Sequence, residues 1–315
     1  MATIKEQTEK TEQLKTSLDN KVNSIGSIIN TKIKEKPTTL TQVEDALRRK
    51  MLGIGDTITD LQLEGLGFLT QGSFAGHTAS VRALTLDSEY LYSGSEDCTV
   101  IKIRKSNMAE VGKFIGLTEP VYALTSDNEY IYSCGSEGTV RKVRKSDMVE
   151  VGQFTAGTDY HVDAITLDNE YIYSGGSGLV RKVRKSNMAE VGQFTGHNGY
   201  YVYALTSDNE YIYSSSSDKT VRKVRKSNMA EVNKFIGLTE PVYALTSDNE
   251  YIYSGSEDCT VIKIRKSNMA EVGKFIGLTN PVNALAIDNE YIYSDGNDYT
   301  VRKWFKYMLY KIISI

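Results

Sequence analysis

The sequence predicts an all-β fold: a six-bladed β-propeller of four-stranded antiparallel blades, preceded by an N-terminal α-helical segment. The first observation is an internal repeat. The stretch Val121–Ser133 recurs almost unchanged in copies that begin at Val81, Val121, Val162, Val202, Val242 and Val282. The copies follow one another every 40 residues, once 41. A fixed period of this size is typical of solenoids, propellers and repeat arrays.

The second observation is the content of one repeat. Val121–Thr125 and Tyr130–Ser133 flank a turn of Asp, Asn and Glu, and Thr139–Arg144 and Met148–Phe154 follow after two further turns. Val, Ile, Tyr and Thr favour strands, whereas Asp, Asn, Ser and Gly favour turns. Four antiparallel strands in each repeat of this length are typical of a propeller blade, and a closed ring protects the strand edges.

We therefore divide the chain into three predicted parts. Residues 1–36 form a helical coiled-coil segment, 37–66 a short helix and linker, and 67–315 the propeller. The first part carries one narrow apolar stripe, with steps of three and four residues, formed by Leu14, Leu18, Val22, Ile25, Ile29 and Ile33. Such a stripe needs partner helices, so we expect a homo-oligomer, for example a trimer. The alternative is a single helix that lies on the next domain.

Composition excludes several classes of function. The net charge is −3, which gives no overall attraction to nucleic acid or to anionic membranes. No apolar run is long enough for a spanning helix, so we expect no membrane insertion. The polar start lacks an apolar signal core, and we expect synthesis in the cytoplasm without a signal peptide. The three cysteines, Cys98, Cys134 and Cys259, show no pairing logic and are expected to be free thiols.

The differences between the copies point to one face of the propeller. The Asp-Asn-Glu turn and the Arg-Lys-Ser-Asn-Met turn hardly change, and both lie on one side, which we call the constant face. There we expect Asp127, Glu129 and Lys145 to form a solvated surface of mutually neutralised charges rather than a cation site. The loops of the other side, the variable face, differ from copy to copy.

The variable face is the predicted binding surface, because binding residues are often placed on loops of a rigid scaffold. The loops ahead of repeats 3 and 4 are one residue longer than the others and bring in tyrosines and histidines. Tyrosine suits both sugar faces and protein contacts. The predicted contact residues are Tyr160, His161, His197, Tyr200, Tyr201, His77 and Tyr299.

Motifs for catalysis do not occur in the sequence. There is no Gly-rich phosphate loop, no zinc-type Cys/His spacing and no nucleophile elbow, so we expect a protein that is not an enzyme and has no cofactor. His161 and His197 could share a metal ion, but solvated or hydrogen-bonded histidines are the favoured interpretation. We therefore predict no metal site.

The repeat region resembles the WD-repeat propeller family. The residues that carry the resemblance are Gly76-His77, Gly196-His197, Ser93–Val100 and Thr300–Trp304. The chain departs from the family pattern, because its Trp-Asp pair survives only as Trp304-Phe305 and most repeats lack the histidine. We therefore expect no repeating His/Ser/Asp/Trp hydrogen-bond network, and stability from apolar packing instead. Residues 70–74 and 309–315 both match an outermost strand, and either could close the last blade.

The N-terminal segment resembles tail-fibre and baseplate proteins of phages and phage-like particles of Gram-positive bacteria. The resemblance is carried by Lys5–Leu18, by the Asn/Ile/Lys-rich run to Ile33 and by Glu35–Leu40. It implies a virion or tail-like particle, with other tail or baseplate proteins and a cell-surface glycan or protein as partners. The alternative is an intracellular scaffold for protein–protein interaction, in the cytoplasm.

Overall fold

The computed structural model describes residues 73–315, apart from 158–160, 276–277, 296–300 and 307–315. By contacts, the chain divides into two units, Met1–Gln71 and Gly72–Ile315. The predicted helices within residues 1–66, with the stripe from Leu14 to Ile33, lie outside the described residues and stay predictions.

The described residues form strands and the turns between them. The first strands of the repeats are β1 (Val81–Leu86), β5 (Val121–Ser126), β9 (Val162–Leu167), β13 (Val202–Ser207), β17 (Val242–Ser247) and β21 (Leu285–Ile287). The second strands are β2 (Tyr90–Ser95), β6 (Tyr130–Gly135), β10 (Tyr171–Gly176), β14 (Tyr211–Ser216), β18 (Tyr251–Ser256) and β22 (Tyr291–Asp295). The third strands are β3 (Val100–Arg104), β7 (Thr139–Arg144), β11 (Val180–Arg184), β15 (Val221–Arg225), β19 (Val261–Arg265) and β23 (Val301–Phe305). The fourth strands are β4 (Ala109–Phe114), β8 (Glu150–Thr155), β12 (Ala189–Phe194), β16 (Ala230–Phe235) and β20 (Ala270–Phe275).

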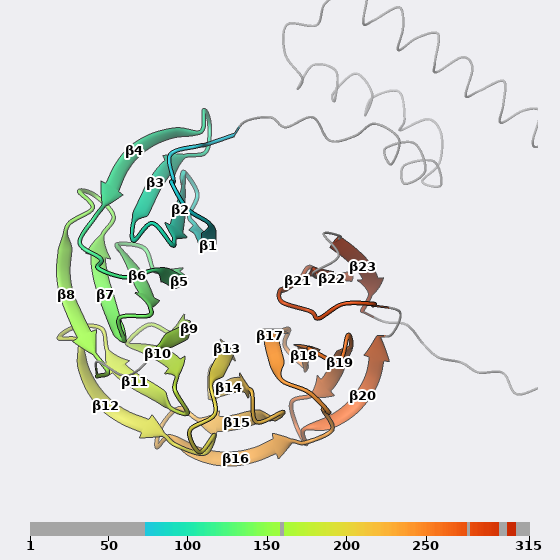
Figure 1. The fold of residues 1–315 in the computed structure, drawn as a ribbon. Helices are drawn as coiled ribbons and strands as arrows, with labels where there is room; N and C mark the ends of the chain where they lie inside the picture. Colours follow the sequence, from blue (N-terminus) through green and yellow to red (C-terminus); the bar gives the residue numbers. More distant parts are fainter. Residues whose placement is uncertain (1–72, 158–160, 276–277, 296–300, 307–315) are drawn as a thin grey trace, which may run out of the picture. The chain divides into compact units, whose positions relative to one another are not determined.

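Each repeat folds into its own antiparallel sheet, as predicted. Among the described residues there are five four-stranded sheets and one three-stranded sheet, β21-β22-β23, and we number these blades 1 to 6 in chain order. In Figure 1 the first strand of each four-stranded blade faces the middle of the array, and the fourth strand lies at its periphery. The two candidate segments for closing blade 6, residues 70–74 and 309–315, lie wholly or mostly outside the described residues.

The apolar core lies between the blades. One face of each blade contributes a Tyr, a Val and, in most blades, a Phe, and the facing side of the next blade contributes Val, Ile and, in most blades, Met. At the junction of blades 1 and 2, for example, Tyr92 and Val100 pack against Val121 and Ile131. The second of the two tyrosines in each second strand is at most 1% exposed from blade 1 to blade 5: Tyr92, Tyr132, Tyr173, Tyr213 and Tyr253. The strand repeat therefore builds a core of blade-to-blade contacts, as the apolar pattern predicts.

A polar tie accompanies this apolar contact at every described junction. In each blade the turn between the first and second strands begins with an aspartate, which accepts a hydrogen bond from the hydroxyl of a tyrosine five residues later. From blade 1 to blade 5, Oδ2 of this aspartate also forms an ion pair with a lysine of the next blade. At the first junction Tyr92 donates to Asp87 over 2.9 Å, and Nζ of Lys145 lies 3.0 Å from the same oxygen.

The tie recurs with almost constant geometry. The lysine Nζ to aspartate Oδ2 distances are between 3.0 and 3.3 Å. The members of the five ties are Asp87–Tyr92–Lys145, Asp127–Tyr132–Lys185, Asp168–Tyr173–Lys226, Asp208–Tyr213–Lys266 and Asp248–Tyr253–Lys306. Each lysine backbone carbonyl also accepts a hydrogen bond from a lysine of the preceding blade, as from Lys102 to Lys145 over 2.8 Å. Stability therefore rests on polar contacts as well as on apolar packing.

The structure corrects the expectation for the constant face. The constant face is not merely a surface of solvated charges, because the lysines of the ties are largely buried. Asp127 pairs with Lys185 of the next blade, and Lys145 pairs with Asp87 of the preceding one. The reason is geometric: a lysine that reaches back across the junction meets the aspartate 58 positions earlier, and not the carboxylates of its own blade.

As expected, the His/Ser/Asp network does not recur in every blade; it forms around His77 and His197. His77 lies 2.9 Å from Asp97 and 2.7 Å from Ser93. His197 lies 2.8 Å from Oδ2 of Asp218 and 2.8 Å from the hydroxyl of Ser214. In blades 2, 5 and 6 a buried leucine takes the place of this histidine: Leu117, Leu238 and Leu278.

Candidate functional site

The loops of the variable face lie together in the structure. The loop before a first strand meets the loop between the second and third strands of the same blade through backbone hydrogen bonds. The backbone nitrogen of Glu96 donates to the carbonyl of Ser80 over 2.9 Å, and the backbone nitrogen of Glu257 donates to the carbonyl of Pro241 over 2.9 Å. In blade 4 Ser217 donates to Tyr201 over 2.9 Å. On the constant face the two turns of a blade also meet through a backbone hydrogen bond. The backbone nitrogen of Lys145, for example, donates to the carbonyl of Glu129 over 2.9 Å. Each blade thus has one constant end and one variable end.

Two of the predicted contact residues are internal supports. His197 has no exposed surface, and its ring nitrogens face Asp218 and Ser214. The side chain of His77 is only 5% exposed and is held by Asp97, Ser93 and Thr99. A partner cannot reach a fully buried ring, so His197 is corrected from a contact residue to a residue that fixes its loop.

Three predicted residues lie on the accessible surface. His161, Tyr200 and Tyr201 are exposed, the two tyrosines by 55% and 45%. Tyr160 and Tyr299 lie outside the described residues. Of the accessible three, His161 and Tyr201 lie next to each other, with ring centroids 6.4 Å apart and planes at 84°.

His161 and Tyr201 belong to a longer series of aromatic rings. Tyr122 of β5 stacks on His161 with centroids 6.4 Å apart and an interplanar angle of 8°. Tyr201 lies 6.2 Å from Tyr203 of β13, and Tyr203 lies 5.1 Å from Tyr243 of β17. These five rings, the aromatic row, run without interruption from blade 2 to blade 5 at the variable ends of the inner strands. Offset-stacked and edge-to-face rings at such distances attract one another.

Carboxylates accompany the row. The hydroxyl of Tyr243 donates to Oε2 of Glu257 over 3.0 Å, and burial together with this bond raises the pKa of Tyr243 to about 12. Burial, and next to it the charge of Asp163, also raises the pKa of Tyr203. Asp163 itself has its pKa raised by burial, against the opposing effect of His161. The row therefore combines flat aromatic surfaces with negative charge.

Two glycines allow the loop of blade 4 to pass close to blade 3. Gly178 and Gly199 both adopt positive φ, at 80° and 87°. A Cβ atom on Gly178 would lie 2.4 Å from the backbone nitrogen of Gly199. Tyr201 then forms an isolated antiparallel bridge with Ser177. This contact positions Tyr201 beside His161.

Sequence reasoning missed Tyr122, Tyr203 and Tyr243, although a signal was present. The position after the repeated valine of the first strand differs between the copies, while most of the strand around it does not. In chain order it holds Arg82, Tyr122, Asp163, Tyr203, Tyr243 and Asn283. Most positions of the first strands are the same in nearly all copies, so sequence reasoning treats these strands as constant. It therefore overlooks the variable position after the repeated valine.

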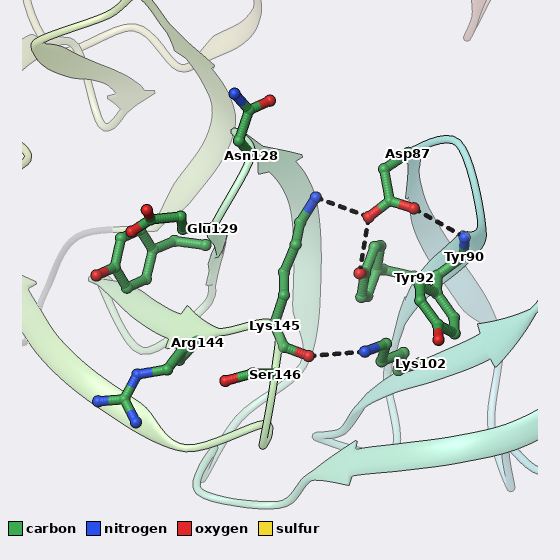
Figure 2. Close-up of a pocket in the computed structure, with 10 residues that line it drawn as sticks. Asp87, Tyr90, Tyr92, Lys102, Asn128, Glu129, Arg144, Lys145 and Ser146 are labelled. Atoms are coloured by element: carbon green, nitrogen blue, oxygen red, sulfur yellow. Dashed lines mark hydrogen bonds and ion pairs between the residues drawn. The ribbon is translucent and has the colours of Figure 1, made fainter.

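A pocket of about 510 Å³ lies on the constant face at the junction of blades 1 and 2. Figure 2 shows Lys145 reaching from blade 2 to Asp87, which also binds Tyr92 and the backbone of Tyr90. Lys102 donates to the carbonyl of Lys145 on the other side. Because these polar groups are engaged with one another, the pocket is the surface of a structural tie rather than a prepared ligand site.

No group of three or more His, Cys, Asp or Glu side chains in the described part of the chain is arranged to hold a metal ion. Cys98, Cys134 and Cys259 are free thiols. No helix within the described ranges has the length and apolarity required to cross a membrane.

The geometry defines a class of protein: a propeller built from internal repeats, with a constant structural face and a variable aromatic one. Comparison with protein families leads further. The model of the WD domain, G-beta repeat, matches residues 69–101, 188–223 and 230–262, about a third of the chain. The chain therefore contains WD40 repeats and forms a six-bladed β-propeller.

Solved structures show the same fold. The computationally designed Ika8 protein is similar at 20% identity and a TM-score of 0.67, over 73% of this chain and 72% of that one. The WD40 beta propeller domain of Doa1 is similar at 19% identity and 0.64, over 74% and 80%. U3-55K is similar at 18% identity and 0.67, over 73% and 79%. A comparison with curated proteins gave no match.

Proposed function

We propose that this protein is a scaffold that binds other proteins through its variable face, and that the aromatic row is the centre of the contact. The observation that carries the proposal is the row itself, from Tyr122 to Tyr243. The five rings come from four blades and lie at the end of the blades where the copies differ. Tyrosine is enriched in protein interfaces because it offers a large, rigid, amphipathic contact at low entropic cost.

The division between the two faces supports this role. The constant face uses its recurring aspartates and lysines internally, in ties that hold neighbouring blades together. The variable face has exposed rings and exposed carboxylates such as Glu119 and Glu257. The WD40 repeats are compatible with a binding scaffold. Because a fold alone does not specify a function, the proposed role rests on the aromatic row.

The test is a selection of peptides from a random library displayed on yeast, with the full chain as bait. We expect peptides whose affinity falls at least tenfold when Tyr201 and Tyr203 are replaced together by alanine, as for central interface residues. Glu129→Ala is the matched control, because its side chain is exposed on the constant face. Peptides that bind the double variant as tightly as the wild type, or that respond only to Glu129→Ala, would contradict the proposal.

A display role in a phage tail or tail-like particle is a separate proposal. It is supported by the sequence pattern of residues 1–66, which would attach and oligomerise the chain through the stripe from Leu14 to Ile33. Several weakly binding faces would then act together through their high effective concentration. Light scattering of the full chain tests it: an oligomer is expected, and a monomer would remove the display role without affecting the binding role of the row.

A further inference from the structure

We propose that the aromatic row receives a positively charged side chain, arginine or lysine, from the partner protein, with Asp163 as its counter-charge. This inference rests on the proposed function and names the chemistry of the partner. It starts from one departure in the repeat. Asp163 is the only acidic residue at the variable position of the first strands, where blades 2, 4 and 5 carry tyrosine.

Asp163 is a carboxylate without a partner in the described part of the chain. It lies on β9 and is half-buried. No hydrogen bond or ion pair reaches its carboxylate from any described residue, and burial raises its pKa with only the charge of His161 opposing the effect. Charged groups that are partly removed from water are normally paired. A cation from outside the chain would supply the missing partner.

The surroundings of Asp163 favour a cation in particular. His161 lies two residues before it on the chain, and the charge of Asp163 acts on Tyr203 of the next blade. Tyr122, His161, Tyr201 and Tyr203 are successive members of the row. The faces of tyrosine rings attract ammonium and guanidinium groups, and the attraction grows when the site excludes water. The aromatic rings and the carboxylate of Asp163 therefore both attract an ammonium or guanidinium group.

The charges around the row favour a basic partner segment over an acidic one. Glu119 and Glu257 are exposed on the loops of blades 2 and 5, on either side of Asp163. The basic residues of the variable face are engaged: Nε of Arg82 donates to Glu96 over 2.7 Å, and Lys219 lies 3.3 Å from Glu240. A neutral glycan could stack on the rings, but it would leave Asp163 without a counter-charge. A basic side chain satisfies both features.

The experiment is a double-mutant cycle with the peptides selected on the full chain. In each peptide the basic residue is replaced by a neutral analogue of similar shape, citrulline for arginine or Nε-acetyl-lysine for lysine. Affinities are measured by calorimetry for the wild type and for Asp163→Asn. We expect the neutral peptide to bind the wild type about tenfold more weakly, the size of a hydrogen-bonded charge contact. Asp163→Asn should lose about the same factor for the basic peptide.

The cycle distinguishes this inference from the function on which it rests. In Asp163→Asn the basic and neutral peptides should differ by less than about twofold, because the charge partner is gone. Glu129→Gln on the constant face should retain the full difference. If selected peptides bind the row but contain no basic residue, or if Asp163→Asn still distinguishes the two peptides tenfold, the inference is wrong and the binding role stands. If no peptide depends on the row, the proposed function itself fails.

Discussion

The two ends of the inner strands behave differently. At the constant end the same aspartate, tyrosine and lysine recur at all five described junctions with nearly the same distances. At the variable end one position changes from arginine to tyrosine, aspartate or asparagine while most of its neighbours stay the same. The difference shows how an array of near-identical repeats can serve two tasks. Contacts between blades must be alike because the blades are alike, whereas contacts with a partner need not be.

Acid should have the largest effect, because it acts on every junction together. Burial alone would raise the pKa of the tie aspartates, but hydrogen bonds from the turn backbone, tyrosine and lysine lower it in each. In the histidine networks Asp97 and Asp218 have pKa values lowered to about 2 by hydrogen bonds that outweigh burial. Groups with a depressed folded-state pKa stabilise the fold above their unfolded value of 3.8 and lose this effect as pH falls through the folded value.

The free energy of unfolding should therefore be nearly constant above about pH 5 and fall steeply between about pH 4 and 2. Urea titrations across this range measure it. A free energy that does not change between pH 5 and 2 would contradict the account of the ties.

Two tyrosines of blade 4 lie only ten residues apart, one at each end of the inner strands, and their replacement should have very different effects on stability. Tyr213 is 1% exposed and donates to Asp208 over 2.8 Å, so Tyr213→Ala should cost about 3–5 kcal/mol, as for other buried aromatics. Tyr203 is half-buried at the variable end, and Tyr203→Ala should cost less than about 1 kcal/mol. Urea unfolding of both variants gives the two values. Equal losses would mean that the row is part of the structural core.

Two histidines of the variable face should differ in their effect on stability, because His197 is buried and supports its loop whereas His161 is exposed. His197→Leu introduces the residue that blades 2, 5 and 6 carry at this place, but removes the ring that contacts Asp218 and Ser214. Asp218 keeps its hydrogen bonds from Thr220 and Arg222. The cost should be about 1–3 kcal/mol. The matched control is His161→Leu, at an exposed position, which should leave stability unchanged. A larger effect of His161→Leu on stability would overturn its assignment to the binding surface.

A single tie can be compared at the middle and at the end of the array. Asp208 binds both Tyr213 and Lys266 of the next blade, so Asp208→Asn should cost about 1–2 kcal/mol. Asp288 of blade 6 binds Tyr293 over 2.7 Å, and no lysine of a following blade reaches it among the described residues. Asp288→Asn should therefore have a smaller effect in the same urea titration. The reverse order would show that the tie lysines contribute little.

The smallest expected effect concerns Asp163, whose behaviour should be opposite to that of the ties. Its pKa is raised by burial, so the charged form weakens the fold at neutral pH. Asp163→Asn should raise the free energy of unfolding at pH 7 by less than about 1 kcal/mol, and this gain should shrink as the pH falls toward 3.8 and be absent below it. A loss of stability at pH 7 would mean that Asp163 has an internal partner after all.

The sequence allowed most of the fold to be predicted, because periodicity and strand composition act locally. The segment Thr139–Arg144 was predicted with its exact bounds, and Val121–Thr125 within one residue of β5. The ties could not be predicted, since Lys145 meets Asp87 only through the rotation between two blades. The binding face was chosen from loop differences, but Tyr203 and Tyr243 lie on strands. These two rings are close because the first strands of neighbouring blades lie next to each other. That arrangement cannot be inferred from the spacing of residues along the chain.

The measurement that tests the central claim most directly compares binding and stability in two variants of one blade. Tyr203→Ala removes a ring from the row, and Tyr213→Phe removes only the hydroxyl that binds Asp208. We predict that Tyr203→Ala weakens the binding of selected peptides at least tenfold with an almost unchanged urea midpoint. Tyr213→Phe should lower the midpoint and leave the affinity unchanged. If Tyr203→Ala keeps its affinity while Tyr213→Phe loses it, the assignment of the two faces is wrong.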